Sequence, residues 1–355
     1  MWKRGLSPFS HFVYICGEMA IRVVPVVIIG AGPAGSVCAN LLKEAGTECV
    51  LVDFRSFPRD KVCGGGLTPR AWHALEDMMP DFQYDYVAVK RYRLIVNGRV
   101  RAQVEPTDEQ RNVCRKDFDN ALLQRFIKSG GEFIQDSFLR FEEQQDGRIL
   151  VTMRSGLQIL CRYLVAADGA NSRVRKQLLG RYKGNVLFWE QDVTKGDGVL
   201  DGEFSSRYDC GYYYRFPHKD HDVVGYGAKD ASLEGFRKLL ADLGIAKTRI
   251  RGANIPVEVV ESGRDDVILI GDAGGFVNKL TYEGLYYAFV TGRNAAKAIL
   301  EGIPFTEANK DIFRRKRREK WITDFFYSRI GLWLVRVLSG NVRFVKFALE
   351  KVSGV

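Results

Sequence analysis

The chain has 355 residues, of which 46% are hydrophobic and 27% charged, and this ordinary globular balance excludes a disordered chain, a collagen-like repeat and a fibrous coil. Its 53 Lys and Arg residues outnumber its 43 Asp and Glu residues, for a net charge of +10. Residues 305–355 alone carry twelve Lys/Arg against five Asp/Glu, a net charge of +7. A local basic end indicates an acidic surface, either membrane or nucleic acid, as the partner of that segment.

The seven cysteines are scattered and contain no CxxC pair, which argues against a disulfide framework and a zinc site and favours a reducing cytoplasm. No uncharged apolar run reaches the length of about 18 residues that a membrane span needs. Residues 1–21 are expected to be a leader. Its first 18 residues are either disordered or an upstream extension that a start at Met19 would omit.

The first predicted elements form one βαβ unit. An apolar, β-branched run at 23–29 predicts a buried parallel strand, and a glycine-rich turn follows it at once. A helical pattern at 36–45 ends at Gly46 in the C-cap position, and a second strand is predicted at 48–52.

Further along the chain, helical and strand patterns alternate. The alternating pattern at 86–104, with Asn97-Gly98 as its turn, predicts a hairpin. The remaining predicted elements are helices at 118–129, 233–243 and 282–301 and strands at 132–140, 149–154, 163–167 and 267–270. Beyond Pro304 the pattern is helical and basic.

This order predicts an α/β fold: a Rossmann-like nucleotide-binding domain, an inserted antiparallel-sheet substrate domain and a C-terminal helical segment. The nucleotide-binding domain is expected at 22–85, 105–180 and 263–304, and is therefore discontinuous. The substrate domain is expected at 86–104 and 181–262, and the basic helical segment at 305–355.

Gly30, Gly32 and Gly35 form the spacing GxGxxG between the first strand and the first helix. The first glycine permits the turn, the second lets a pyrophosphate approach the backbone, and the third allows close contact between helix and strand. Asp53 follows Gly35 by 18 residues, near the spacing expected of a carboxylate that binds a ribose. The alternative is a tight turn without a ligand.

Two more glycine–aspartate turns each follow a buried strand. One begins at Asp168-Gly169 and the other runs from Gly271-Asp272 to Gly275. A carboxylate at a strand end can accept from a ribose or ribitol hydroxyl, and the backbone N–H groups after it can face phosphate. Either turn alone would be an ordinary connection, but three in this order indicate a dinucleotide.

These three motifs resemble those of the FAD-dependent oxidoreductases built like aromatic hydroxylases. Within that superfamily, Lys-Val-Cys-Gly-Gly-Gly-Leu at 61–67 resembles an element of the geranylgeranyl reductase family. Tyr-Tyr-Tyr-Arg-Phe-Pro at 212–217 resembles the substrate-cavity motif of that family, and 272–285 its third FAD segment. The resemblance covers about 22–304 and implies non-covalent FAD and hydrogenation of isoprenoid double bonds, often on lipids.

The sequence departs from the family pattern on the substrate side. Tyr214 stands where the family usually has Trp, and His218 where it often has Lys. Lys279 and Tyr282 replace a Pro and a Gly in the loop beside the flavin ring. These departures leave the FAD motifs intact and concern the identity of the prenyl substrate.

Several candidate residues can be interpreted either as functional or as purely structural. Arg115 could bind FAD phosphate or lie on the surface, and Cys63 could touch substrate or flavin or be a buried small side chain. Lys279 could lie near the pyrimidine edge of the flavin or face solvent. Tyr212, Tyr214 and Phe216 are expected on one face of a strand, lining either a cavity or the core. The residues expected to hold the cofactor are Gly30, Gly32, Pro33, Ala34, Gly35, Asp53, Arg55, Cys63, Gly64, Gly65, Arg115, Asp168, Gly169, Gly271, Asp272, Gly275, Lys279, Glu283, Gly284 and Leu285; those expected to act on the substrate are Cys63, Tyr212, Tyr214 and Phe216.

The expected function is reduction of a carbon–carbon double bond in a hydrophobic substrate by hydride transfer from flavin N5, with NAD(P)H or a small electron carrier as reductant. Two alternatives stay open: an FAD-dependent monooxygenase, and a non-catalytic flavin-binding protein at a membrane. A halogenase is less expected because its lysine motif is missing. No metal and no nucleic acid are expected. The segment 314–338 predicts an interfacial helix that attaches a cytoplasmic protein to the inner face of a membrane, unless its aromatic residues form the core of a helical cap.

Overall fold

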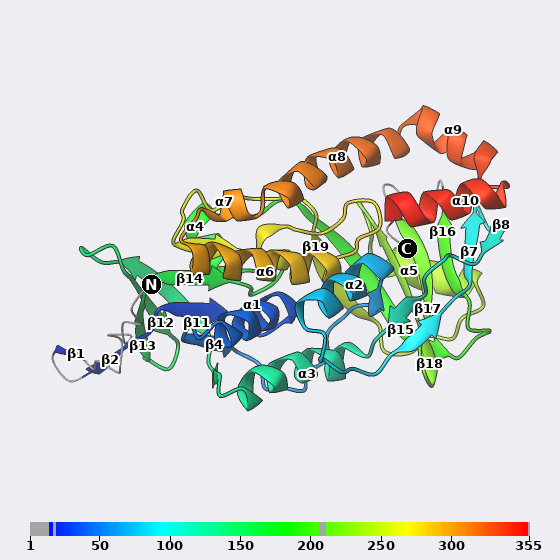
Figure 1. Cartoon of the computed structure of the whole chain (residues 1–355). Coiled ribbons are helices and arrows are strands. Elements are labelled where there is room, and N and C mark those ends of the chain that lie inside the picture. The colour runs from blue at the N-terminus through cyan, green and yellow to red at the C-terminus, as the bar shows by residue number, and fades with distance from the viewer. Residues whose placement is uncertain (1–13, 17–18, 206–210, 354–355) are drawn as a thin grey trace.

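The computed structural model describes residues 14–16, 19–205 and 211–353. Figure 1 shows an elongated molecule with a sheet-and-helix layer around α1 and α6 in its middle and a second large sheet at one end. The C-terminal helices run along one long edge. The expected leader lies largely outside the described residues; within it, β1 (Tyr14–Cys16) and β2 (Met19–Val23) are strands.

A parallel sheet of five strands forms the centre of the nucleotide-binding region, as the α/β fold class predicts. In order across the sheet, its strands are β10 (Glu132–Gln135), β4 (Cys49–Asp53), β3 (Val26–Ile29), β14 (Tyr163–Ala166) and β20 (Val267–Leu269). The strands β3, β14 and β20 are neighbours although they come from distant parts of the chain. Their carboxyl ends therefore bring the three predicted glycine–aspartate turns to one edge.

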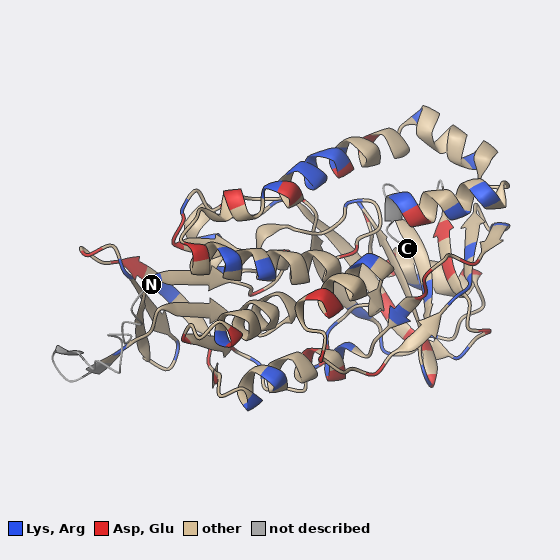
Figure 2. Ribbon diagram, viewed as in Figure 1, with Lys and Arg blue, Asp and Glu red and all other residues tan. Residues whose placement is uncertain are grey.

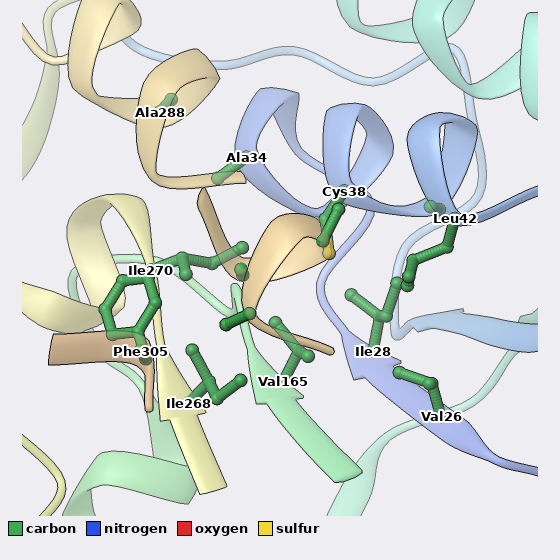
Figure 3. Close-up of a cluster of buried hydrophobic side chains, with 14 of the residues drawn as sticks. Val26, Ile28, Ala34, Cys38, Leu42, Val165, Ile268, Ile270, Ala288 and Phe305 are labelled. Carbon is green, nitrogen blue, oxygen red and sulfur yellow. The ribbon is translucent and has the colours of Figure 1, made fainter. Parts of the chain in front are cut away.

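The two faces of this sheet bury alternate residues. Val26 and Ile28 of β3 face the helices α1 (Pro33–Glu44) and α6 (Leu285–Glu301), and Figure 3 shows them beside Cys38 and Leu42 of α1. Val27 and Ile29 pack on the other side against a second sheet of strands β1, β2, β13 (Gln158–Cys161), β12 (Ile149–Met153) and β11 (Phe138–Glu143). Burial on both faces explains the continuous apolar runs in the sequence.

Several predicted element boundaries are wrong. The first strand is interrupted at Pro25, and α1 begins at Pro33, because proline suits the first position of a helix. The predicted strand 132–140 is two strands, β10 and β11, in different sheets. The helix predicted from 282 begins at Leu285, since Tyr282 has a φ of 54°, outside the helical region.

The second large sheet has seven strands and includes the predicted hairpin, whose turn residues Asn97 and Gly98 both have positive φ. In order, its strands are β19 (Arg251–Pro256), β15 (Asn185–Thr194), β18 (His221–Ala228), β17 (Tyr212–Pro217), β16 (Leu200–Phe204), β7 (Tyr92–Val96) and β8 (Arg99–Val104). Helix α5 (Leu233–Asp242) covers one face, through contacts such as that of Phe236 with Tyr226. Tyr213 of β17 faces α5, whereas Tyr212, Tyr214 and Phe216 lie on the opposite face.

A three-stranded sheet connects the two regions: β5 (Gly66–Leu67), β9 (Gln110–Asn112) and β6 (Val87–Val89). The remaining helices are α2 (Pro69–Met78), α3 (Arg115–Lys128), α4 (Arg173–Leu179), α7 (Phe305–Ala308), α8 (Lys310–Phe326), α9 (Arg329–Leu338) and α10 (Val342–Ala348), with a 3-10 turn at Gly271–Gly274 and a π-turn at Leu349–Ser353.

Candidate active site

The three glycines of the first turn have different surroundings. A Cβ added to Gly30, whose φ is 106°, would lie 2.3 Å from the Ala167 carbonyl oxygen, and one added to Gly35 would lie 1.9 Å from the Gly30 carbonyl oxygen. Both positions need glycine for backbone packing. A Cβ added to Gly32 would meet only the Arg59 guanidinium, at 3.5 Å. One face of Gly32 is therefore open toward a cation at the N-terminus of α1, where an anion is favoured.

Arg59 belongs to a buried cluster of two arginines and one aspartate. Arg115 binds the fully buried Asp119 through two hydrogen bonds of 2.8 and 2.9 Å, and Arg59 lies 3.2 Å from the same carboxylate. Burial acts to lower the pKa of Arg115, but Asp119 and Cys63 outweigh it and raise that pKa; burial lowers the pKa of Arg59. The cluster has one positive charge in excess. Arg115 is therefore buried, and Arg59, which no local motif marks in the sequence, lies nearer to Gly32.

Asp53, at the end of β4, supports the same turn from the other side. Its Oδ2 accepts a 2.8 Å hydrogen bond from the Ala31 N–H, and its Oδ1 accepts one of 2.9 Å from the Arg55 N–H. The side chain of Arg55 is exposed and lies over the Phe54 ring. Asp53 thus fixes the turn by accepting from two backbone N–H groups. Each of its carboxylate oxygens keeps a lone pair that can accept from a ribose hydroxyl.

The other two carboxylate turns meet through Arg175. Asp168 accepts from the Arg173 N–H at 2.7 Å and caps α4, while its second oxygen, Oδ1, is buried and has no hydrogen-bond partner. Burial raises the pKa of Asp168. Arg175 donates to the carbonyls of Asp272 and Ala273, at 3.1 and 2.8 Å, and so ties α4 to the third turn.

The third turn bends sharply and leads into the N-terminus of α6. Gly271 and Gly275 both have positive φ, and a Cβ on Gly275 would lie 2.0 Å from the Glu258 carbonyl oxygen. A Cβ on Gly284, the N-cap of α6, would lie 3.4 Å from Asp272 Oδ1, so the carboxylate of Asp272 faces the start of that helix.

Two charged residues of this segment already have partners in the protein. Lys279 lies 2.8 Å from Glu258 Oε1 and is largely shielded, so its charge is balanced there. The buried carboxylate of Glu283 accepts from Thr68 and from Arg70, whose Nε is 2.8 Å away. Leu285 is the first residue of α6. The segment is therefore held by side chains from α2 and from the strand-rich region.

The Cys-Gly-Gly-Gly loop packs directly on β17. A Cβ on Gly64 would lie 2.6 Å from the Phe216 ring, and one on Gly66 would lie 2.9 Å from it, so these glycines make room for that ring. His218 Nε2 hydrogen bonds to the Gly64 carbonyl at 3.0 Å. Cys63 is partly buried, and its sulfur accepts from the Gly65 N–H at 3.4 Å.

The predicted common face of Tyr212, Tyr214 and Phe216 is confirmed. Their ring centroids are 6.0 Å apart for the first pair and 4.8 Å for the second. The Tyr212 hydroxyl donates to the Thr281 carbonyl at 2.7 Å, and its ring stacks on Tyr282 at 5.9 Å. The aromatic face therefore joins the Cys-Gly-Gly-Gly loop to the third FAD-like segment.

Glu190 is a buried carboxylate at this junction that sequence reasoning missed. Its Oε2 accepts from the Tyr214 hydroxyl at 3.1 Å and its Oε1 from the Cys63 N–H at 3.1 Å. Burial raises the pKa of Glu190 although Arg251, 3.4 Å away, acts to lower it, and burial next to Glu190 raises the pKa of Tyr214. In the sequence Glu190 is one of two acidic residues in a mixed polar and apolar strand, so nothing local marks it.

Comparison with known proteins gives consistent results. The FAD binding domain family matches residues 23–194. The geranylgeranyl diphosphate reductase of Rhodobacter capsulatus is 31% identical over 77% of this chain and 74% of that protein, and the menaquinone reductase of Mycolicibacterium smegmatis is 30% identical over 78% and 76%. The geranylgeranyl bacteriochlorophyll reductase-like protein of Thermoplasma acidophilum has the same fold, with a TM-score of 0.79 and 17% identity over 93% of this chain and 96% of that chain.

The residues at the three turns fit FAD. The open face of Gly32 beside Arg59 suits a pyrophosphate, because it offers helix N–H groups and a guanidinium. The orphaned Asp168 Oδ1 can accept from a hydroxyl group, which would satisfy an otherwise unpaired buried oxygen. The chain is thus an FAD-binding protein. Its other motifs, the Cys-Gly-Gly-Gly loop and the aromatic face of β17, meet where that face contacts Thr281 and Tyr282.

Proposed function

The chain belongs to the geranylgeranyl reductase family of FAD-dependent oxidoreductases, and from this premise we propose that it reduces a carbon–carbon double bond in a hydrophobic, isoprenoid substrate. One observation carries the proposal: the aromatic face of Tyr212, Tyr214 and Phe216 abuts both the Cys-Gly-Gly-Gly loop and the segment 277–284. The same place holds a buried hydrogen-bonded pair, Tyr214 and Glu190.

Bound FAD would supply a hydride at its N5 atom. The protein would hold its pyrophosphate with Gly32 and Arg59 and its hydroxyl groups with Asp53 and Asp168. Gly32, Asp53 and Asp168 follow or end the strands β3, β4 and β14 and are placed by the sheet, whereas Arg59 is held by Asp119 of α3, so these groups need little adjustment on binding. Cys63 stays a proposed contact of substrate or cofactor.

Saturation of an alkene adds one hydride and one proton. The Tyr214 hydroxyl is the proposed source of the proton, and its hydrogen-bond partner Glu190, whose pKa burial raises, is the proposed group that returns a proton to it. The three aromatic rings would exclude water and bind an apolar chain. This assignment gives Tyr212 and Phe216 the role of binding, and Tyr214 the role of proton transfer.

The reductant is proposed to be NAD(P)H or a small electron carrier. We propose that the protein is cytoplasmic and attached to the inner face of a membrane. The reason is that a prenyl chain long enough to cover the aromatic face is itself a membrane component. Relatives named for geranylgeranyl and menaquinone reduction support a lipid-soluble substrate.

The experiment is aerobic turnover of FAD-loaded protein with a geranylgeranyl lipid and a reductant under ¹⁸O₂. A product that gains hydrogen without oxygen-18 supports reduction. A product that carries oxygen-18 would make the protein a monooxygenase, and the Tyr214→Phe variant should then lose nothing.

A further inference from the structure

Helix α9 is apolar on nearly all sides and buries almost nothing. The helix runs from Arg329 to Leu338, and its two polar residues are Arg329 and Arg336. Although the rest of the helix is apolar, Gly331 is its only buried residue. Ile330 is 65% exposed and Trp333 60% exposed. A helix with this composition normally lies in a core or a membrane interface.

The neighbouring helices extend the same surface. Of 17 large hydrophobic side chains exposed among the described residues, ten lie between 321 and 347. In chain order they are Trp321, Ile322, Phe325, Ile330, Leu332, Trp333, Val337, Val342, Phe344 and Phe347. Figure 1 places α8, α9 and α10 along one edge of the molecule, so we call these ten side chains the apolar edge. A concentration of exposed apolar side chains on consecutive helices marks an interaction site.

Cations flank the apolar edge. Figure 2 shows Lys and Arg gathered on the middle of α8, whereas α9 carries two arginines, Arg329 and Arg336, and no acidic residue. Arg314, Arg317, Arg318 and Lys320 are exposed. Lys316 is not: it is buried, donates to the Val277 carbonyl and lies 3.4 Å from Glu319. The basic run therefore divides into outward cations and one inward lysine that ties α8 to the flavin-side segment.

We infer that the apolar edge and its flanking arginines form a docking surface for an anionic lipid bilayer. Exposed tryptophan and phenylalanine suit the acyl boundary, and arginine suits lipid phosphate. A second copy of this chain is a poorer occupant, because it would oppose two segments of net charge +7. Among the described residues no helix is long and apolar enough to cross a bilayer, so the surface would lie in the interface.

The surface is fixed to the body of the protein at both ends. Arg101 of β8 donates to Ser339 Oγ at 3.2 Å and to the Arg336 carbonyl at 3.1 Å, and Tyr287 of α6 donates to Glu319 of α8. Docking would therefore orient the whole molecule.

An aromatic path runs inward from this surface. The Phe326 ring at the end of α8 lies 5.5 Å from Phe204, and Phe204 lies 5.7 Å from Tyr212. In the docked orientation, a prenyl chain would pass from the bilayer to Tyr212 along these rings. This step, and no other in the inference, rests on the proposed function.

The test is flotation of the full chain with vesicles of phosphatidylcholine, with and without phosphatidylglycerol, at low and high salt. We expect the parent to float with the anionic vesicles at low salt. The floated fraction should be about tenfold smaller for two triple variants, Ile330→Ser/Trp333→Ser/Val337→Ser and Arg314→Gln/Arg317→Gln/Arg318→Gln. Matched controls elsewhere on the surface are Leu139→Ser/Leu243→Ser/Leu300→Ser and Lys229→Gln/Arg237→Gln/Lys238→Gln, which should float like the parent. Brominated lipids should quench the fluorescence of the parent more than that of Trp321→Phe/Trp333→Phe.

Flotation needs neither FAD turnover nor substrate, so its result stands whether or not the proposed reduction occurs. No flotation of a folded parent chain would overturn the inference, as would equal flotation of the edge variants and their controls. Sedimentation of the lipid-free parent as a dimer that the α9 variant dissociates would assign the surface to a second copy and would likewise overturn it.

Discussion

The Tyr214 hydroxyl of β17 donates a 3.1 Å hydrogen bond to Glu190 Oε2 of β15, across Gly225 of the intervening strand β18. The other oxygen of Glu190 accepts from the backbone of Cys63, so one buried carboxylate joins the aromatic face to the Cys-Gly-Gly-Gly loop. This pair is where the structure offers a proton beside an apolar surface. Its chemistry can be tested separately from the binding of FAD.

Replacing Glu190 with Gln should slow alkene reduction by about 100-fold or more, since proton transfer by a positioned group contributes on that order. The rate of the parent should fall as pH rises through the raised pKa of Glu190, because the proton is then lost. The variant should lack that step in its pH profile. Glu203→Gln, at another buried carboxyl of the same sheet that binds the Gly98 N–H, is the control and should keep the parent profile.

Substitutions at two glycines of the first turn test FAD binding and folding separately. Gly32→Val should fold with an unchanged melting temperature but purify without yellow colour, because its new side chain enters the open face beside Arg59. Gly35→Ala should instead fold poorly, since its Cβ would lie 1.9 Å from a backbone oxygen. Thermal melts and flavin absorbance measure both. A yellow Gly32→Val protein would place the pyrophosphate elsewhere.

His218 should make the protein less stable in mild acid. Burial lowers the pKa of His218, so the folded state binds its proton less tightly than the unfolded chain, whose value is about 6.5. The free energy of unfolding should therefore fall as pH drops below about 6.5 toward the lowered pKa. His218→Gln should flatten this dependence in denaturant titrations between pH 7 and 5. Parallel curves for parent and His218→Gln would refute the assignment.

Glu283→Gln should loosen the segment 277–284. The change leaves the buried Arg70 guanidinium without its carboxylate, and breaking a buried pair in this way costs about 3–5 kcal/mol. We expect a loss of unfolding free energy in that range together with weaker FAD binding. Glu142→Gln, which breaks an exposed pair with Arg140, should cost less than about 1 kcal/mol. Equal effects of the two substitutions would show that Glu283 does not support the segment.

Local patterns were enough to predict the architecture. The strand–turn–helix signal around Gly30 to Gly35 depends on neighbours in sequence, and so do the hairpin at Asn97-Gly98 and the alternation of Tyr212, Tyr214 and Phe216. Their geometry follows from backbone and side-chain preferences that act over a few residues.

Residues placed by tertiary contacts were beyond this reasoning. Arg59 lies in an irregular segment, and only the folding of α3 against it, through Asp119, brings it to Gly32. Glu190 looks like a polar residue of a strand until Cys63, from a distant loop, reaches it. Lys316 sits in a run of five cations that looks uniformly solvated, and only the packing of α8 on α6 shows that it points inward.

The most direct test of the central claim is anaerobic mixing of the reduced, FAD-loaded protein with a geranylgeranyl lipid in D₂O, with the flavin spectrum and the product mass followed together. We predict that the flavin is reoxidised without oxygen and that the product gains two hydrogens per double bond, both as deuterium because the N5 hydrogen of reduced flavin exchanges with D₂O, with Glu190→Gln slowing this step. Flavin that stays reduced in the absence of oxygen, with the lipid unchanged, would contradict it.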